Sequence, residues 1–259
     1  MAPDNAPLLV ARDIAKSFGG LSALSGVSIS VSRDEIFGLI GPNGAGKTTL
    51  FNVLTGLYQA DAGTLTFDGA MISSMKPHEV ARCGIARTFQ NIRLFGSMTA
   101  LENVMVGRHV RTGTGVLGAV LRTRHADEEE RAITRRAHEL LDYCGLAARA
   151  DDIARDMPYG DQRRLEIARA LATDPLLLAL DEPAAGMNDT ETAALRRLIE
   201  RISGDGITIL LIEHDMKLVM GLSHNVAVLD YGVKIAEGTP AVVQRNARVI
   251  EAYLGGSVA

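Results

Sequence analysis

Short, almost continuous apolar runs separated by amphipathic segments dominate the hydrophobic pattern of the chain. Three of these runs cover residues 176–180, 207–212 and 226–229. Such runs are typical of strands in a parallel sheet that is covered on both faces. Apolar and polar residues instead alternate in parts of residues 8–31 and over residues 63–69, which predicts antiparallel strands that flank the first core strand in one sheet. We therefore expect an α/β protein.

The middle of the chain has a mainly helical pattern. It extends from Leu101 to Leu146 and is interrupted by a glycine-rich stretch at residues 113–118, so we expect an inserted helical subdomain. A second amphipathic stretch, residues 242–254, predicts a short C-terminal helix with a packing role. No apolar run reaches about 18 residues, and the first residues lack the features of a signal peptide. The sequence therefore predicts no membrane span and no secretion signal.

A glycine-rich segment directly follows the apolar residues 35–40, which are expected to form a strand, and it fits the pattern G-x-x-x-x-G-K-[ST]. Glycines let backbone N–H groups curl around phosphate oxygens, the lysine brings a positive charge to the terminal phosphates, and the threonine hydroxyl can ligate Mg²⁺. The helix expected near Lys47 adds the partial positive charge of its N-terminus. The pattern predicts a nucleoside triphosphate site made of Gly41, Pro42, Asn43, Gly44, Ala45, Gly46, Lys47, Thr48 and the adjacent Thr49.

Two carboxylates follow one of the apolar runs. Asp181 and Glu182 come directly after residues 176–180, and ligands of parallel sheets bind at the carboxyl ends of the strands. We expect Asp181 to hold Mg²⁺ through water and Glu182 to orient or deprotonate the attacking water. The same pair also fits a solvated helix N-terminus, but its coexistence with the phosphate-binding loop favours the catalytic interpretation.

Two further polar residues are candidates for the same site. His214 follows residues 207–212 and is placed to contact the γ-phosphate or the water, with a purely structural role as the alternative. Gln90, which comes after Thr88 and Phe89, can reach the metal or the water with an uncharged amide.

Composition restricts the partners. Hydrophobic residues make up 47% and charged residues 22% of the 259 residues, and the net charge is -4. This charge provides no general attraction for nucleic acid, so we expect no nucleic-acid partner. Basic residues at 108–111 and 122–125 precede the acidic run 127–130, which favours a solvated polar insertion over a membrane-binding or regulatory surface. Cys83 and Cys144 are too few for a disulfide framework and are expected to be buried small residues.

The order of these motifs resembles that of the ATP-binding subunits of ABC transporters over nearly the whole chain. The resemblance implies a P-loop NTPase (RecA-like) core with an antiparallel β subdomain and an inserted helical subdomain. Residues 8–255 then form a single ABC ATPase domain. Within it, residues 8–90 and 166–240 hold the nucleotide-binding core with its β subdomain, residues 91–165 the helical and signature subdomain, and residues 241–255 the C-terminal helix.

The same resemblance implies catalytic functions for individual residues. Asp181 is the Walker B carboxylate, Glu182 the catalytic base and His214 the switch histidine. Gln90 forms the Q-loop. Phe18 holds the aromatic position that stacks on adenine. The implied cofactors are ATP and Mg²⁺, and the implied metal ligands are Thr48, Gln90 and Asp181.

The resemblance also implies that function requires a dimer. In this family two ATPase subunits close head to tail, and each ATP is held between one P-loop and the signature of the other subunit. The residues of this chain that would contact the partner's ATP are Tyr159, Gly160 and Asp161, and residues 185–188 would form the D-loop.

Finer features resemble the longer ATPase subunit of branched-chain amino acid importers. They lie at residues 15–21, 159–171 and 181–188, after Gly107 and in the ending 251–255. This resemblance implies a second ATPase subunit, in a heterodimer or alternatively a homodimer, together with two membrane permeases and, indirectly, a periplasmic substrate-binding protein. The chain is then cytoplasmic and peripheral on the inner face of the cell membrane. A lipid or lipopolysaccharide ABC transporter and a soluble, non-transport ABC ATPase remain alternative functions.

The signature loop departs from the family pattern Leu-Ser-Gly-Gly-Gln. Pro158 replaces the serine that bonds the γ-phosphate, and Asp161 introduces a carboxylate where a neutral amide is usual. Proline is tolerated in a first helical turn, so the fold survives while one hydrogen bond is lost. A carboxylate disfavours a nearby anion. We therefore expect the ATP site completed by this signature to be the weaker one of the pair. Asn188 in place of the D-loop aspartate removes another charge.

Overall fold

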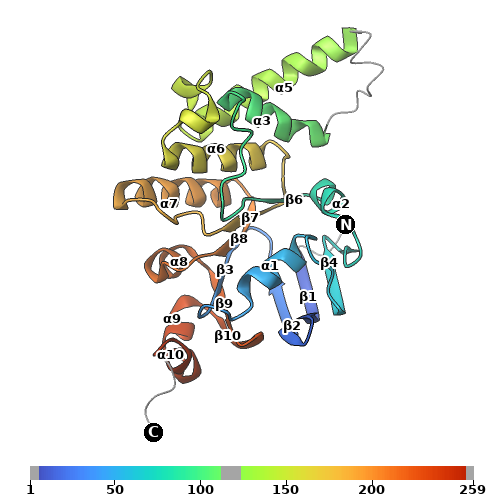
Figure 1. Ribbon diagram of the computed structural model, residues 1–259, viewed down its shortest axis with the longest axis vertical. Coiled ribbons are helices and arrows are strands. Elements are labelled where there is room, and N and C mark those ends of the chain that lie inside the picture. Colours follow the sequence, from blue (N-terminus) through green and yellow to red (C-terminus); the bar gives the residue numbers. More distant parts are fainter. Residues whose placement is uncertain (1–5, 112–123, 255–259) are drawn as a thin grey trace.

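The chain folds into two sheets surrounded by helices (Figure 1). The computed structural model describes residues 6–111 and 124–254. Within these residues a four-stranded sheet has the order β2-β1-β4-β5 and a six-stranded sheet the order β10-β9-β3-β8-β7-β6. The smaller sheet is antiparallel throughout. Its strands are β1 (Leu9–Phe18), β2 (Leu21–Val31), β4 (Ala62–Phe67) and β5 (Ala70–Met71).

The six-stranded sheet is parallel except at one edge, where β10 runs antiparallel to β9. β3 pairs in parallel with β8 and β9, and β7 pairs in parallel with β8 and β6. Because parallel strands end at one edge of a sheet, the segments after β3, β7 and β8 meet there. The strands are β3 (Ile36–Ile40), β6 (Ile85–Arg87), β7 (Leu177–Asp181), β8 (Thr208–Ile212), β9 (Asn225–Asp230) and β10 (Val233–Gly238).

Helices connect the parallel strands and build the inserted region. α1 follows β3, while α7 and α8 connect β7 to β8 and β8 to β9. In the inserted region α3 packs against both α5 and α6. The helices are α1 (Lys47–Leu54), α2 (Pro77–Cys83), α3 (Ala100–Arg108), α5 (Arg124–Tyr143), α6 (Tyr159–Leu171), α7 (Asp189–Gly204), α8 (Met216–Leu222), α9 (Pro240–Gln244) and α10 (Ala247–Leu254), with short 3₁₀ turns at His109–Arg111, Ala147–Arg149 and Ala154–Asp156.

Capping residues start the helices at the ends of loops. Thr99 Oγ1 accepts from the Glu102 backbone N–H at 3.1 Å, and Glu102 Oε2 accepts in return from the Thr99 N–H at 2.8 Å. Asn188 and Glu191 form the same reciprocal pair at the start of α7. Such boxes satisfy N–H groups that have no partner inside the helix, so they set where α3 and α7 begin.

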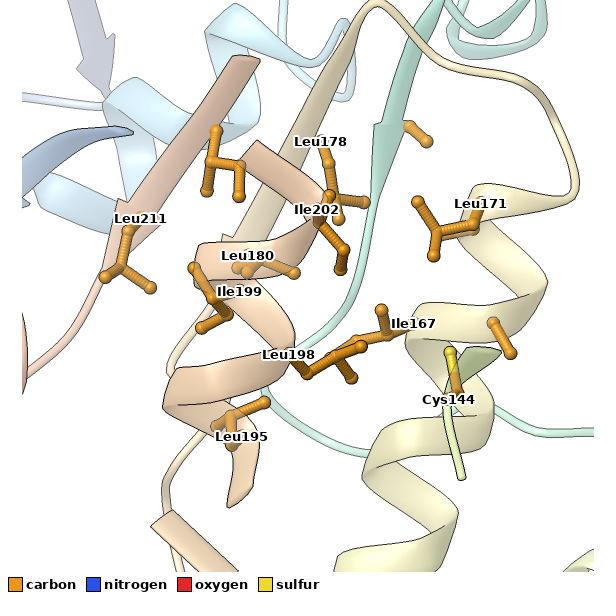
Figure 2. Close-up of a cluster of buried hydrophobic side chains, with 14 of the residues drawn as sticks. Cys144, Ile167, Leu171, Leu178, Leu180, Leu195, Leu198, Ile199, Ile202 and Leu211 are labelled. Carbon is orange, nitrogen blue, oxygen red and sulfur yellow. The ribbon is translucent and has the colours of Figure 1, made fainter. Parts of the chain in front are cut away.

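Strand side chains alternate between two hydrophobic clusters, one on each face of the six-stranded sheet. In β7, Leu178 and Leu180 join the cluster formed with the helices of the inserted region, whereas Leu177 and Ala179 join the cluster formed with α1 and the smaller sheet. Figure 2 shows the first cluster, in which Leu178, Leu180 and, from β8, Leu211 lie against side chains of α6 and α7. Since both faces are covered, β3, β7 and β8 are buried at every position.

Some expectations change with the structure. The strand expected at residues 176–180 is β7, which begins at Leu177 and includes Asp181. The alternating segments do not flank the first core strand, because β1, β2 and β4 pair only with one another and β5. The pairing of β4 with β1 in one sheet was expected.

The C-terminal stretch forms two helices where one was predicted for residues 241–255. α9 begins at Pro240 and ends before Arg245, and α10 begins at Ala247. The glycine-rich residues 113–118 lie outside the described residues, and the acidic run 127–130 belongs to α5. Among the described helices, none combines the length and the apolar character that crossing a bilayer requires.

Candidate functional site

The glycine-rich loop after β3 has the backbone conformation that its glycines were expected to provide. Gly41, Gly44 and Gly46 have φ values of 152°, 79° and 96°, which favour glycine. A Cβ atom would lie 2.2 Å from the Leu229 carbonyl oxygen at Gly41, and 2.7 Å from a backbone oxygen of Ala23 at Gly46. Two of the glycines are therefore required by space as well as by conformation.

Lys47 is the first residue of α1 and folds back across the loop. Its Nζ donates hydrogen bonds to the carbonyl oxygens of Gly41 at 2.7 Å and Pro42 at 2.8 Å. Burial lowers the pKa of Lys47, and the nearby Glu182 carboxylate opposes this effect. A cavity of about 450 Å³ lies against the loop from Gly44 to Thr49. Backbone N–H groups, the N-terminus of α1 and Lys47 therefore line one cavity, which is the arrangement that phosphate binding requires.

Aromatic side chains surround the mouth of this cavity. Phe18, at the end of β1, is 44% exposed and contacts Tyr58 edge to face, with 5.4 Å between the ring centroids. An exposed ring beside a phosphate site is suited to stacking on a base. Tyr231 lines the same cavity and is 88% exposed. The sequence did not single out Tyr231, because it lies in a turn far from the loop along the chain.

Asp181 and Glu182 lie at the carboxyl edge of the six-stranded sheet, where they were predicted. Asp181 is the buried last residue of β7. Glu182 has a φ of 47°, an uncommon conformation for a residue with a side chain, and its N–H donates to the Ile212 carbonyl oxygen at 2.9 Å. The hydrogen bond from Glu182 to the end of β8 thus stabilises this uncommon backbone conformation, which sets the direction of the Glu182 side chain.

Gln90, Glu182 and His214 come together, although they are far apart in the sequence. Glu182 Oε2 accepts a hydrogen bond from Gln90 Nε2 at 2.7 Å. Glu182 Oε1 lies 2.5 Å from His214 Nε2. Both oxygens of the carboxylate are therefore engaged by residues that the sequence had assigned to the same site.

Glu213 is a buried acid that supports this arrangement. Its Oε1 accepts from the Ala184 N–H at 2.7 Å, and its Oε2 accepts from the His214 N–H at 3.0 Å. Burial raises the pKa of Glu213, and these backbone hydrogen bonds oppose the rise. Glu213 therefore ties the segment after Glu182 to the one that carries His214. The sequence placed Glu213 at this edge of the sheet but gave it no function.

Arg163 connects the signature helix to the Q-loop. It is buried in α6 and donates to the carbonyl oxygens of Phe89, at 2.8 Å, and Gln90. Its Nη2 also donates to the Tyr159 hydroxyl at 2.8 Å. Sequence reasoning did not assign Arg163 a function, because it stands between two other polar residues, Gln162 and Arg164.

The signature residues lie at the start of α6, on the opposite side of the six-stranded sheet from the P-loop helix. α6 contributes to the hydrophobic cluster on one face, and α1 to the cluster on the other (Figure 1). Tyr159 is exposed, whereas Gly160 is buried so tightly that a Cβ would lie 2.7 Å from Glu191 Oε1. The signature of one chain is therefore not positioned to complete the P-loop of the same chain.

The Asp161 side chain is engaged inside the helical region. Asp161 is 8% exposed and pairs with Arg149, whose Nε lies 2.7 Å from Asp161 Oδ2, and with Arg164. Two cations thus compensate the carboxylate, which removes the physical basis for the repulsion expected from Asp161. Pro158 precedes α6 and supplies no side-chain hydrogen bond there, in keeping with the lost hydroxyl. Asn188 caps α7, which gives it a local role as well.

The donors at this edge of the sheet fit Mg²⁺. Thr48, Gln90 and Asp181 offer oxygen atoms, which Mg²⁺ prefers, and Mg²⁺ in such sites is completed by water and substrate phosphates. In residues 6–111 and 124–254, no group of three or more His, Cys, Asp or Glu side chains forms a cage for a metal.

Comparisons with known proteins agree with this chemistry. Residues 24–185 match the family described as ABC transporter, and residues 233–259 match the family described as branched-chain amino acid ATP-binding cassette transporter. The chain is 45% identical over 250 residues to BraF of Pseudomonas aeruginosa, a high-affinity branched-chain amino acid transport ATP-binding protein, with 96% of this chain and 98% of BraF covered. Identity to LivG of Escherichia coli, with the same description, is also 45% over 96% of this chain and 98% of LivG.

The fold is likewise similar to solved structures. It superposes on the ADP conformation of MJ1267, an ATP-binding cassette of an ABC transporter, with a TM-score of 0.83 and 34% identity, covering 96% of this chain and 99% of that one. Because the family match covers more than half of the chain and these relatives match almost its whole length, the chain belongs to the ABC transporter family, as an ATP-binding subunit that hydrolyses ATP.

Proposed function

We propose that the chain powers an importer of branched-chain or other hydrophobic amino acids. The observation that carries this proposal is the 45% identity, over 96% of the chain, to a protein described as a high-affinity branched-chain amino acid transport ATP-binding protein. The match of residues 233–259 to the family described as branched-chain amino acid ATP-binding cassette transporter supports it independently of the common ATPase motifs. These similarities disfavour a lipid or lipopolysaccharide transporter and a soluble ABC ATPase.

In the proposed mechanism the P-loop N–H groups and Lys47 hold the triphosphate. Thr48, Asp181 and Gln90 would hold Mg²⁺, which would neutralise the developing charge on the phosphates. Glu182 orients the attacking water and takes its proton. Gln90 and His214 each bond one oxygen of Glu182, and each oxygen keeps a lone pair that can accept a hydrogen bond from the water. The network therefore fixes the orientation of Glu182 without occupying all of its acceptor sites.

The opposite placement of the P-loop and the signature supports a partner of the same kind. A head-to-tail arrangement with a second ATPase subunit would bring each signature onto the other subunit's ATP. We propose a heterodimer, in line with the departures of this signature from the family pattern. The alternative is a homodimer, and sedimentation of the chain alone and with its companion subunit distinguishes the two.

A groove beside the Q-loop supports docking to membrane permeases. A cavity of about 410 Å³ lies between α2, the Q-loop and α3, where Phe89, Arg93 and Phe95 form one wall and Leu57 and Pro77 contribute to the others. Both Leu57 and Phe95 are exposed apolar residues. A short permease segment in this groove would contact the residues next to Gln90. The chain would then be cytoplasmic and peripheral on the inner face of the membrane, and a periplasmic binding protein would act on it only through the permeases.

The test is ATP hydrolysis by the complex assembled with its permeases in proteoliposomes. Substrate-binding protein loaded with leucine, isoleucine or valine is expected to stimulate Mg²⁺-dependent phosphate release, whereas the same protein without amino acid or with arginine is not. The Glu182→Gln complex controls for contaminating ATPases. Hydrolysis that ignores branched-chain amino acids but responds to lipid or lipopolysaccharide would contradict the proposed cargo, and no hydrolysis in the wild type would contradict the function itself.

A further inference from the structure

Arg87, the last residue of β6, is a cation whose side chain is only 12% exposed and which the mechanism above does not use. Its Nη1 donates to Asn52 Oδ1 at 2.9 Å and to Thr55 Oγ1 at 2.7 Å. Asn52 lies in α1 and Thr55 caps its C-terminal end. Nη2 donates to Asp181 Oδ2 at 3.3 Å. One side chain therefore ties the P-loop helix to the Walker B carboxylate.

Two aromatic rings hold the Arg87 guanidinium in place. Its central carbon lies 4.7 Å from the centroid of Phe51 and 4.6 Å from that of Phe89. A planar guanidinium packs on aromatic rings and directs several N–H groups in fixed directions, whereas a lysine ammonium is a flexible point charge. The surroundings thus require arginine and not only a positive charge.

The Arg87 guanidinium fixes the direction of the Asp181 carboxylate. Asp181 is almost completely buried, and its Oδ2 lies 3.3 Å from Arg87 Nη2. Because Asn52, Thr55 and two aromatic rings hold the guanidinium, this bond restricts rotation of the carboxylate. A metal bound at Thr48 would need the carboxylate to point toward the P-loop.

We propose that Arg87 is a positioning residue for Asp181, whose carboxylate it holds in the direction that Mg²⁺ binding beside the P-loop requires. The inference rests on the proposed Mg²⁺-dependent hydrolysis at this edge of the sheet. Arg87 acts through Asp181, so its loss weakens the use of Mg²⁺ more than the binding of the nucleotide itself.

The test is equilibrium binding of a fluorescent ATP analogue, first in EDTA and then with increasing Mg²⁺. For Arg87→Gln we expect metal-free affinity within about twofold of wild type and a Mg²⁺ midpoint raised about tenfold, since a charge-assisted hydrogen bond is lost. Arg87→Lys is expected to reverse only a small part of this rise, because an ammonium keeps the charge but not the fixed N–H directions of the guanidinium. Arg201→Gln is the matched control, because the Arg201 guanidinium also packs on an aromatic ring, Tyr143 at 4.1 Å, but belongs to α7 and has no contact with Asp181, so its Mg²⁺ midpoint should equal that of wild type.

Two results would overturn the inference. A wild-type Mg²⁺ midpoint in Arg87→Gln would show that Asp181 does not depend on Arg87, and equal losses of affinity with and without Mg²⁺ would show a general structural role. If Arg87→Gln does not fold, Thr55→Val is the second variant, because it removes one hydrogen-bond partner of the Arg87 guanidinium. We then expect a smaller rise of the Mg²⁺ midpoint. A Thr55→Val midpoint equal to that of wild type would also contradict the inference. If nucleotide binding and turnover of the wild-type protein are the same with and without Mg²⁺, both the proposed mechanism and this inference are wrong.

Discussion

Glu182 is the proposed general base, and three separate segments define its surroundings. β8 holds its backbone, Gln90 approaches from the segment after β6, and His214 from the segment after β8. Adjacent acids after an apolar run were enough to identify Asp181 and Glu182 from the sequence. The contacts with Gln90 and His214 were not readable, because they depend on the order of strands in the sheet.

Replacing Glu182 with glutamine should lower turnover by about 10²- to 10⁴-fold, because the general base is lost. ATP affinity should be retained, since glutamine has the same size and still forms hydrogen bonds. Steady-state phosphate release and equilibrium nucleotide binding by the assembled complex measure the two effects. Glu200→Gln, on the exposed face of α7 where Glu200 pairs with Arg196, serves as the control. A Glu182→Gln turnover within tenfold of wild type would mean that another group is the base.

The two cysteines should differ in reactivity, although both were expected to be buried. Cys144 is buried and Cys83 only partly so. Burial raises the pKa of Cys144 to about 12. Since only the thiolate reacts, and its fraction falls as the pKa rises, about 10⁻⁴ of Cys144 is ionised at pH 8.

Iodoacetamide at pH 8 should therefore modify Cys83 and spare Cys144 in the folded protein, and modify both in denaturant. Mass spectrometry of peptides after timed labelling measures this. Fast modification of Cys144 under native conditions would show that the cluster around it opens readily.

At the scale of elements, α6 holds both the signature and the Q-loop. Arg163 donates to the backbone of Phe89 and Gln90 while the start of the same helix presents Tyr159 and Gly160. Residues 159–171 were identified from the sequence only through a family resemblance. The inward direction of Arg163 could not be predicted, because a helical pattern does not tell a buried, bonded cation from a solvated one.

The two unusual signature residues should behave differently when restored to the family pattern. Pro158→Ser should raise ATP turnover by up to about tenfold, because a hydroxyl regains one hydrogen bond to the partner's nucleotide. Asp161→Gln should not raise turnover and should lower the melting temperature, because Arg149 and Arg164 lose their buried partner.

Phosphate release by the assembled complex and thermal unfolding of the isolated chain separate these effects. Glu139→Gln, whose exposed carboxylate pairs with Arg136 in α5, is a control for removing a surface charge from the helical region. Faster turnover in Asp161→Gln would show that the Asp161 carboxylate repels the partner's ATP despite its pairing with two arginines.

At the scale of the whole molecule, the central sheet separates the two halves of an ATP site. α1 and the smaller sheet cover one face, and α6 and α7 the other. The Glu182→Gln protein should therefore sediment as a dimer with its companion subunit in Mg²⁺ and ATP, and as monomers without nucleotide. Adding Lys47→Ala should abolish this association, because the charge facing the phosphates is lost. Monomers under all conditions, alone and with the companion, would contradict the nucleotide-bridged dimer.

The sequence alone determined the local chemistry of this protein. A phosphate-binding loop, acids at strand ends and capped helices are each specified by residues close together in the chain, because turns, caps and periodicity depend on neighbours. Only the tertiary structure decided that β1, β2 and β4 leave the core sheet, that Arg149 and Arg164 neutralise Asp161, and that Arg87 joins α1 to Asp181. These features arise from long-range packing, because a buried charged group needs hydrogen-bond or ion-pair partners, and the fold supplies them from segments that are distant in the sequence.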